Sequence, residues 1–389
     1  MVEVGAKQFN DGNFKSLSFE LRNVDVSVVN SLRRSILSDI ECLVFRAFPY
    51  NESSIQIEKN TTKFNNEYIK HRLACIPICN NDTSSFENYM KNYVIELDEV
   101  NDTMEKVYVT TENLKIKNKN TGEYLENDKV RSDFFPPDEK TGDYIIICTL
   151  YPNFNKKEEK EALKFEANFS IGKAKENSCW NVAHTCAHQC IQDEDTIQKV
   201  IDSTTMTKYE EADFRLLDAQ RIVHKDEYKF TVESLDIYNT VELVEKACDY
   251  IIGRLRLIIQ NLTDNDRVIL TKEATEYNAT DGTLSSEKLE ELHNAYIKLF
   301  SYDGFIVIEI MDDDYTIGKL LEKYLYKFHG NRSLSFIGFK KEHPTTPEAF
   351  IYLKFAEKRD ENTVHDIVSE TCGAIIKIYD IIKENISKK

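Results

Sequence analysis

Two long amphipathic segments constrain the fold of this 389-residue chain more than any other feature. In residues 240–262 and again in residues 363–386, large apolar side chains recur at spacings of three and four positions, which is typical of a helix with one buried seam. Burying a seam of six such side chains stabilises a fold by roughly 10 kcal/mol at most. Because neither seam can stay in water, we expect the two helices to pack on each other.

The seams are defined by their side chains. The first consists of Val241, Val244, Cys248, Ile251, Leu255, Ile258 and Leu262. The second consists of Val364, Ile367, Thr371, Ile375, Ile378 and Ile382.

A shorter amphipathic helix is predicted over residues 28–40, after a strand at 17–26. On a helical wheel Leu32 and Ile36 belong to one buried stripe, whereas Asn30 and Arg34 lie on the opposite side with Arg33 at the flank. Arginine offers fork-shaped donors that suit carboxylates and carbonyls. The pattern predicts an inward pairing face and an outward arginine face, although a merely solvated face would look the same.

A second short helix is predicted over residues 317–328, with Ile317, Leu320, Leu321 and Tyr324 on its apolar side. It follows Asp314, as the first short helix follows Asp25. The chain therefore repeats one order: a strand, an acidic residue, a short helix and later a long helix. We expect the two units to pair within the chain as a pseudo-dimer, which is asymmetric because the second short helix has no arginine pair.

The whole pattern predicts an α+β fold. The first domain combines residues 1–47 and 181–262, and a β-rich insert domain at 48–180 interrupts it. A linker at 263–299 follows, with a short helix marked by Leu289, Leu292, Tyr296 and Ile297. The second unit covers residues 300–389. A linker of 23 residues at 263–285 spans roughly 25 Å and so reaches across a small domain.

Charge and composition exclude several classes of protein. A chain with a net charge of −17 is repelled by the phosphate backbone, which argues against a primary role in nucleic-acid binding. No apolar run is long enough to cross a bilayer, and the N-terminus shows no apolar leader segment. Nine cysteines without such a leader predict reduced thiols. We expect an intracellular protein that does not bind membranes.

One metal site is worth considering because His184, Cys186, His188 and Cys190 alternate. On one strand, neighbouring same-face residues lie about 6.6 Å apart, so four collinear ligands cannot surround a zinc ion at bonds of about 2.0–2.3 Å. We predict no metal and no cofactor. The alternatives left open are an independent zinc-binding module or enzyme built on residues 184–190, and a generic protein-interaction scaffold. The acidic residues 312–314 precede a helix, which favours capping over metal catalysis.

Four stretches in the first part of the chain resemble the α-type subunits of RNA polymerases. Residues 19–37 resemble the family signature, and residues 71–78 (HRLACIPI) are similar to its H-R-L-x-x-I-P-L. Residues 172–180 resemble its G-x-G-K-x-H-A-K-W with a changed middle, and residues 230–234 resemble its f-x-I-E-S. This family includes the bacterial α subunit, the archaeal D subunit and the third-largest subunit of eukaryotic polymerase II.

The last part of the chain resembles the small α-like subunit, which is the archaeal L subunit or the eleventh subunit of polymerase II. Residues 312–321 are similar to its N-E-D-H-T-L-G-N-L-L, and residues 335–344 are similar to its f-x-G-Y-x-x-P-H-P. In cellular polymerases the two kinds of subunit are separate chains that form a heterodimer. Here they look fused, as in some large DNA viruses of eukaryotes.

The resemblance implies a bacterial-α-like dimerisation domain and a second small α-like domain in one non-catalytic assembly platform of a DNA-directed RNA polymerase. It implies docking of the two largest, catalytic subunits and of small subunits resembling the tenth and twelfth of polymerase II. DNA would be met only through the complex, and no homodimer is expected. The protein would act in the host cytoplasm and virion if viral, and otherwise in the nucleus. The implied partner-binding residues are Asn30, Arg33, Arg34, His71, Arg72, Lys173 and Trp180.

Overall fold

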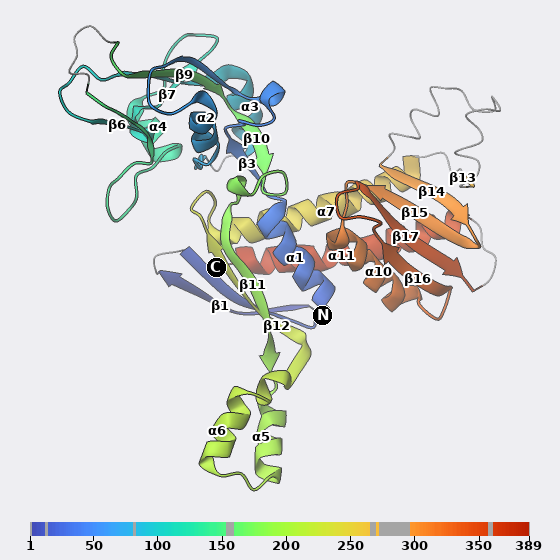
Figure 1. The fold of residues 1–389 in the computed structure, drawn as a ribbon. Helices are drawn as coiled ribbons and strands as arrows, with labels where there is room; N and C mark the ends of the chain where they lie inside the picture. The colour runs from blue at the N-terminus through green and yellow to red at the C-terminus, as the bar shows by residue number, and fades with distance from the viewer. Residues whose placement is uncertain are drawn as a thin grey trace, which may run out of the picture.

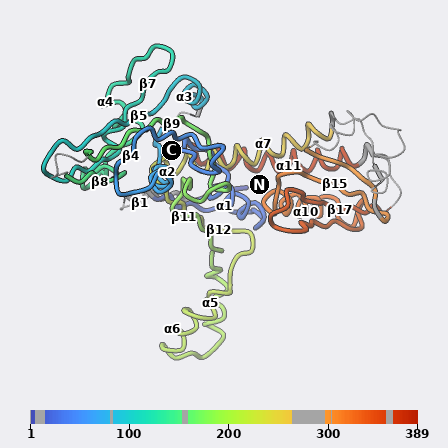
Figure 2. The backbone as a smooth tube through the Cα atoms, turned by 45° about the horizontal axis from the view of Figure 1, so that its top comes forward, coloured from blue at the N-terminus to red at the C-terminus, as the bar shows by residue number. Residues whose placement is uncertain are grey.

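The computed structural model describes residues 2–11, 15–80, 83–152, 159–264, 270–271, 296–356 and 361–388. Within them the chain has the expected α+β fold, with two α-like units and an insert (Figure 1). The insert, the second unit and a helical arm extend from the first unit in three different directions (Figures 1 and 2). None of the described helices is both long and apolar enough to cross a membrane.

The first unit is a four-stranded antiparallel sheet in the order β1-β2-β12-β11, covered by two helices. Leu17, Phe19 and Leu21 alternate along β2 and are fully buried, as a strand with one covered face requires. Phe19 faces Phe230 on β12, and the two rings stack at 5.2 Å. The elements are β1 (Glu3–Asp11), β2 (Lys15–Arg22), α1 (Val26–Ser38), β11 (Ala183–Gln192), β12 (Val223–Ser234) and α7 (Thr240–Asp264).

The second unit repeats this plan with a five-stranded sheet in the order β13-β14-β15-β17-β16. Helix α10 packs on β16 and β17, while α11 packs on α7 of the first unit. The elements are β13 (Leu270–Thr271), β14 (Ile297–Tyr302), β15 (Phe305–Met311), α10 (Tyr315–His329), β16 (Leu334–Lys340), β17 (Glu348–Phe355) and α11 (Glu361–Ser387).

The insert contains a sheet in the order β4-β9-β5-β7, a separate β6-β8 pair and three short helices. It joins the first unit through β3 and β10, which pair with each other. Its strands are β3 (Glu41–Val44), β4 (Ile55–Asn60), β5 (Tyr93–Val100), β6 (Val107–Thr110), β7 (Lys115–Asn118), β8 (Ile146–Leu150), β9 (Ala162–Asn168) and β10 (Ser170–Lys173). Its helices are α2 (Asn66–Ala74), α3 (Phe86–Asn92) and α4 (Asn127–Asp133).

A helical arm made of α5 (Glu194–Ser203) and α6 (Lys208–Leu216) connects β11 to β12. Single turns of 3-10 helix complete the described chain. They cover Tyr50–Glu52, Thr83–Ser85, Thr111–Asn113, Ser178–Trp180 and Ala219–Arg221.

Helices α7 and α11 lie antiparallel and join the two units. Lys383 on α11 binds Asp249 on α7 at 2.6 Å, and Ser387 contacts Glu245 one turn away on each helix. Helix α1 packs against α7 on one side and α10 on the other. The predicted packing of the two long helices on each other is therefore confirmed.

The structure corrects the sequence analysis in the linker and in the insert. Ile297, predicted in a short helix, begins β14, because it pairs with Ile310 on β15. Leu270 and Thr271, expected in an unstructured linker, pair with β14 as β13. Leu289 and Leu292 lie outside the described residues. The insert, predicted only as β-rich, also contains the short helices α2, α3 and α4.

Candidate functional site

The interface between the two units is centred on α1 and α10, whose first residues are held in the same way. Asp25 caps α1 by accepting a hydrogen bond from the Ser27 amide at 2.9 Å. Asp314 caps α10 by accepting one from the Thr316 amide at 2.7 Å. The predicted equivalence of Asp25 and Asp314, and the capping role of Asp314, are therefore confirmed.

Two reciprocal ion pairs join these helices. Arg34 of α1 binds Asp314 at 2.6 Å, and Lys323 of α10 lies 3.5 Å from Asp25. Each basic residue comes nine positions after the aspartate that caps its own helix. The two ion pairs are therefore related by the pseudo-two-fold symmetry of the paired units.

The prediction that Arg34 faces outward is wrong. Its Nε also donates to the Thr316 hydroxyl at 2.8 Å, so the side chain lies on the second unit. The helical wheel placed Arg34 opposite the sheet of its own unit, but α10 covers part of that side of α1. Lys323 supplies a matching cation, so the expected asymmetry fails at this position. It holds at the preceding residue, where Arg33 of α1 corresponds to Glu322 of α10.

The Arg34–Asp314 pair changes the acidity of the carboxyl group. Burial alone would raise the pKa of Asp314. Hydrogen bonds from the side chain and amide of Thr316, together with the positive charge of Arg34, outweigh burial and hold that pKa below its ordinary value. The carboxylate is thus charged over the whole neutral range.

A buried hydroxyl pair connects α11 to α1. The Tyr379 hydroxyl lies 2.5 Å from the Ser31 hydroxyl and donates to the Val28 carbonyl at 3.2 Å. Both Tyr379 and Ser31 are almost completely buried. Burial raises the pKa of Tyr379 well above its ordinary value, so the hydroxyl keeps its proton and can donate.

A third polar contact fixes the start of α10 against α7. Arg254 of α7 binds Asp313, with the closest atoms 3.2 Å apart, and the Tyr296 hydroxyl donates to the same carboxylate at 2.5 Å. Asp313 is 4% exposed, so its charge needs these partners. The acidic residues before α10 therefore serve the interface between the units.

The apolar side chains expected at the internal pairing interface are buried on α1, α7, α10 and α11, with one exception. Ile378 is partly exposed, and the neighbouring Tyr379 is buried in its place. The buried side chains are Leu32, Ile36, Val244, Cys248, Ile251, Leu255, Ile258, Ile317, Leu320, Leu321, Tyr324 and Ile375.

A groove of about 530 Å³ opens beside this interface, and its lining comes from both units. The first unit contributes Ser27, Asn30 and His188, and the second contributes Lys319 and Tyr326. Within the described chain, neither the Ser27 hydroxyl nor His188 Nδ1 has a hydrogen-bond partner. The groove exists only when the two units are docked.

Arg33 is bound to Asn30, which lines this groove, and no ion pair of Arg33 is found among the described residues. Its Nε and one terminal nitrogen donate to Asn30 Oδ1 at 3.1 and 2.9 Å, which fixes the guanidinium group along α1. Burial lowers the pKa of His188, and the charge of Arg33 lowers it further. The remaining donors of Arg33 make it the arginine of α1 that can still reach a partner.

Comparison with known proteins supports the same two units. The RNA polymerase Rpb3/Rpb11 dimerisation domain matches residues 18–255 through one family model, which is more than half of the chain. The chain belongs to this family. A second model of the same description matches residues 306–385. The chain thus carries two dimerisation domains, as a fusion of two α-type subunits would.

Two curated relatives match short parts of the chain. Subunit 3 of DNA-directed RNA polymerases II, IV and V from Arabidopsis thaliana is 38% identical over 60 residues, or 15% of this chain and 17% of that protein. A conjugation stage-specific protein from Tetrahymena thermophila is 34% identical over 76 residues, or 20% of this chain and 21% of that protein. The matches thus span about a fifth of each relative.

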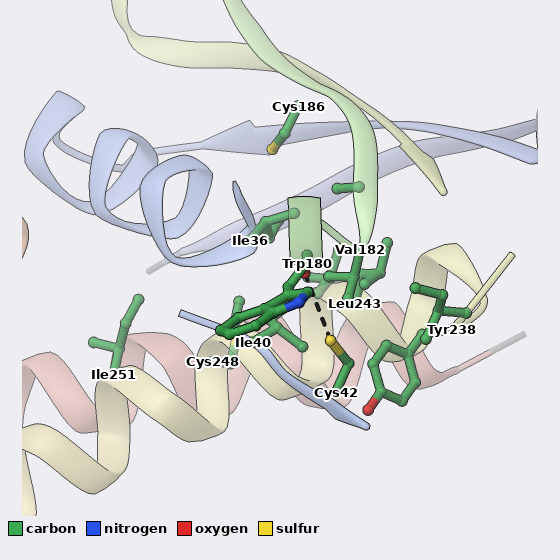
Figure 3. Close-up of a cluster of buried hydrophobic side chains, with 14 of the residues drawn as sticks. Ile36, Ile40, Cys42, Trp180, Val182, Cys186, Tyr238, Leu243, Cys248 and Ile251 are labelled. Atoms are coloured by element: carbon green, nitrogen blue, oxygen red, sulfur yellow. Dashed lines mark hydrogen bonds between the residues drawn. The ribbon is translucent and has the colours of Figure 1, made fainter. Parts of the chain in front are cut away.

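Trp180 lies inside the first dimerisation domain rather than on its surface. It is 5% exposed, and a Cβ atom at Gly172 would lie only 2.5 Å from its ring, so glycine is required there. The Arg46 guanidinium stacks 4.9 Å from the ring centre. Figure 3 shows the ring among the side chains of Ile36 on α1, Leu243 on α7 and Ile40, which follows α1. Direct binding of a partner by Trp180 was therefore a wrong prediction, since the residue forms the junction with the insert.

The other predicted partner-binding residues are spread over the insert. His71 is exposed on α2, whereas Arg72 donates to the Ile146 carbonyl at 2.6 Å and so holds α2 against β8. Lys173 binds Glu41 at 3.0 Å across the β10–β3 pair. The structure does not bring these residues together with Arg33, and their partner-binding role stays a prediction.

The alternating histidines and cysteines of β11 do not share one face. A register shift near Ala183 lets His184 bind Glu233 at 3.2 Å, while Cys186 is buried under α1 and Cys190 is exposed. Burial raises the pKa of Cys186 to about 12, which disfavours the thiolate that zinc needs. Among the described residues, no three His, Cys, Asp or Glu side chains group together as metal ligands.

Proposed function

We propose that this protein is the non-catalytic assembly platform of a multisubunit DNA-directed RNA polymerase. One observation carries the proposal: two dimerisation domains of a polymerase family dock within one chain through reciprocal ion pairs between α1 and α10. Such docking combines the two dimerisation domains into a single surface. Nucleotidyl transfer would then belong to the partners that this surface collects.

The two largest polymerase subunits are the proposed partners of the groove beside α1. The groove is lined by both dimerisation domains, so a segment that enters it would recognise only the docked form. Val26 and Tyr326 are half exposed at its edge, and Arg33 offers free donors beside it. Apolar anchors next to an arginine are typical of the energetic centre of a protein interface.

Small subunits resembling the tenth and twelfth of polymerase II complete the proposed set of partners. The net charge of −17 supports contact with basic proteins and only indirect contact with DNA. The fusion of two α-type subunits resembles that of some large DNA viruses, so we propose a place in the host cytoplasm and the virion if the chain is viral, and otherwise in the nucleus.

Affinity purification of the tagged chain from its native cells tests the proposal. The wild-type protein should recover the two largest polymerase subunits in equal amounts. Arg33→Glu should reduce that recovery about tenfold or more, since it places a like charge where carboxylates or carbonyls would bind. Lys377→Glu, at an exposed position on α11, is the matched control. Recovery of neither large subunit by the wild-type chain would refute the proposal.

Arg34 is not suited to this test. Arg34→Glu would place a carboxylate beside Asp314 and so separate the two dimerisation domains themselves. A loss of partners would then report misassembly within the chain. The choice of Arg33 avoids this, because in the described part of the chain its side-chain hydrogen bonds go to Asn30 on the same helix and not to the second domain.

A further inference from the structure

The helical arm, residues 193–222, takes no part in the pairing of the dimerisation domains. It leaves the sheet between β11 and β12 and projects away from the insert and from the second domain (Figures 1 and 2). Helix α5 buries a single side chain, Ile197, and α6 buries none. The arm therefore adds almost nothing to the core of the molecule.

One side of α6 carries an exposed apolar stripe. Tyr209, Ala212 and Leu216 fall within about 60° of each other around the helix. Tyr209 is 86% exposed and Leu216 is 66% exposed, and Leu217 extends the stripe with 69% exposure. Neighbouring large apolar side chains that remain in water mark an interaction surface.

Polar contacts beside the stripe hold α6 against α5 and leave the stripe exposed. Arg215 binds Gln198 and Glu194 of α5 at 3.0 and 3.4 Å, and it binds Glu211 one turn back at 3.2 Å. A capping box between Thr207 and Glu210 fixes the start of α6. Helices this short have little stability when isolated. These polar contacts therefore stabilise α6 while the stripe remains exposed.

Charge identifies the kind of surface that the stripe fits. Residues 193–222 contain eight acidic and four basic side chains, a net charge of −4. Asp213 and Asp218 flank the stripe, and Arg215 between them is bound by Glu194 and Glu211. A complementary surface therefore has an apolar recess with lysine or arginine at its rim.

We propose that the arm docks into such a recess on another protein subunit of the same polymerase, which rests on the function proposed above. Phosphate groups of nucleic acid or of a membrane surface would meet the acidic flank and be repelled. A second copy of this chain would bring two acidic arms together. A basic protein subunit satisfies both the apolar stripe and its carboxylates.

Photo-cross-linking in the intact complex tests the inference. Tyr209 is replaced by a photo-cross-linking phenylalanine in the full-length tagged chain, and the complex is purified, irradiated and digested. We expect a cross-link to one polymerase subunit, within a peptide that contains apolar residues next to lysine or arginine. A cross-link to a second copy of the chain or to nucleic acid would overturn the inference.

Surface variants give an independent measurement. Tyr209→Ser with Leu216→Ser should lower the amount of the cross-linked subunit in the purified complex about tenfold. Asp213→Lys with Asp218→Lys should lower it as well, whereas Lys199→Ser, an exposed change on α5, should leave it unchanged. All replaced side chains are exposed, so unchanged circular dichroism and melting temperature are expected and show that folding is intact.

The outcomes separate this inference from the function on which it rests. If the wild-type chain recovers the large polymerase subunits but position 209 forms no cross-link and the arm variants keep the full set of subunits, only the inference fails. If the wild-type chain recovers no polymerase subunit, the proposed function fails and the inference fails with it.

Discussion

Two aspartates at the starts of short helices each perform two tasks. Asp25 and Asp314 cap their own helices, and each also binds a basic residue of the opposite helix, Lys323 or Arg34. A carboxylate at a helix N-terminus is already stabilised by the helix dipole. The same charge then fixes how the two domains align.

Removing Arg34 should weaken the docking of the domains. We expect Arg34→Ala to lower the free energy of opening α1 and α10 by about 1 kcal/mol, because the pair is charged and closely spaced but about a third exposed. Lys323→Ala should have a smaller effect, since its pair is longer and more exposed. Native-state hydrogen exchange of the α1 and α10 amides measures both. Equal or absent effects would contradict the account.

His188 should contribute a loss of folding stability as the pH falls from 7 to 5.5. Burial and Arg33 hold its pKa below the value of about 6.5 expected for the unfolded chain. Below about pH 6.5 the His188 imidazole binds a proton in the unfolded state but much less readily in the folded state. Folding stability is therefore lost as the pH falls.

His188→Gln removes this difference in proton binding. We expect the melting temperature of the variant to fall less than that of the wild type between pH 7 and pH 5.5. His71→Gln, at an exposed position, serves as the control and should follow the wild type. An unchanged pH dependence in His188→Gln would contradict the assignment.

Helix α11 joins the two domains through its apolar side and through one tyrosine. The buried side chains of α11 include Cys372, Ile375, Tyr379 and Ile382, which contact elements of both domains. The Tyr379 hydroxyl reaches Ser31 and the Val28 carbonyl on α1. Helix α11 is therefore hydrogen-bonded to helix α1.

Tyr379→Phe should destabilise the pairing by about 1 kcal/mol, because it removes the buried hydrogen bonds of the Tyr379 hydroxyl to the Ser31 hydroxyl and the Val28 carbonyl. Thermal or urea unfolding followed by circular dichroism measures the change. Tyr326→Phe, at a position that is 55% exposed on α10, should have no measurable effect. Equal stability of the Tyr379→Phe variant and the wild type would show that the hydroxyl contributes nothing.

At the level of elements, periodicity predicted the helices that carry the interface but not every strand. The seams of α7 and α11 and the caps of α1 and α10 follow from local patterns that need no tertiary information. Strand β13 is different, because its two residues are ordered by pairing with the distant Phe300 and Ser301. The arm α5–α6 was also missed, since its short helices bury almost nothing.

The candidate site was predictable only in part, because several of its contacts depend on residues that are distant in the sequence. The wheel of α1 correctly placed Leu32 and Ile36 inside, but it could not show that α10 covers Arg34. Tyr379 lies one position after Ile378 in the predicted seam, so a small rotation of the helix decides which of them is buried. Which side chain is buried depends on the helix packed against it, and the sequence of one helix alone does not show how that partner packs.

On the scale of the whole molecule, the apolar helix faces of the two dimerisation domains pack against each other. Reciprocal ion pairs, the α7–α11 pairing and the Tyr379 contact all connect parts of one chain. Among the described helices of the two domains, the apolar faces of α1, α7, α10 and α11 are buried within the chain and so are not open to a second copy. We therefore expect the isolated chain to be a monomer.

Light scattering of the purified chain at micromolar concentration checks this expectation, and it should give the mass of one 45.2 kDa chain. A dimer that dissociates on Ile251→Asp or Leu255→Asp would show that the long helices pair between chains. Both side chains are fully buried here, so an intact monomer should instead unfold on these changes.

The mass of the native complex tests the central claim most directly. Native mass spectrometry of the complex purified through this chain gives the number of copies of each subunit. One copy of this chain with one copy of each of the two largest polymerase subunits is predicted, because both dimerisation domains come from the same polypeptide. Two copies of this chain in each complex, or a complex without the large subunits, would contradict the account.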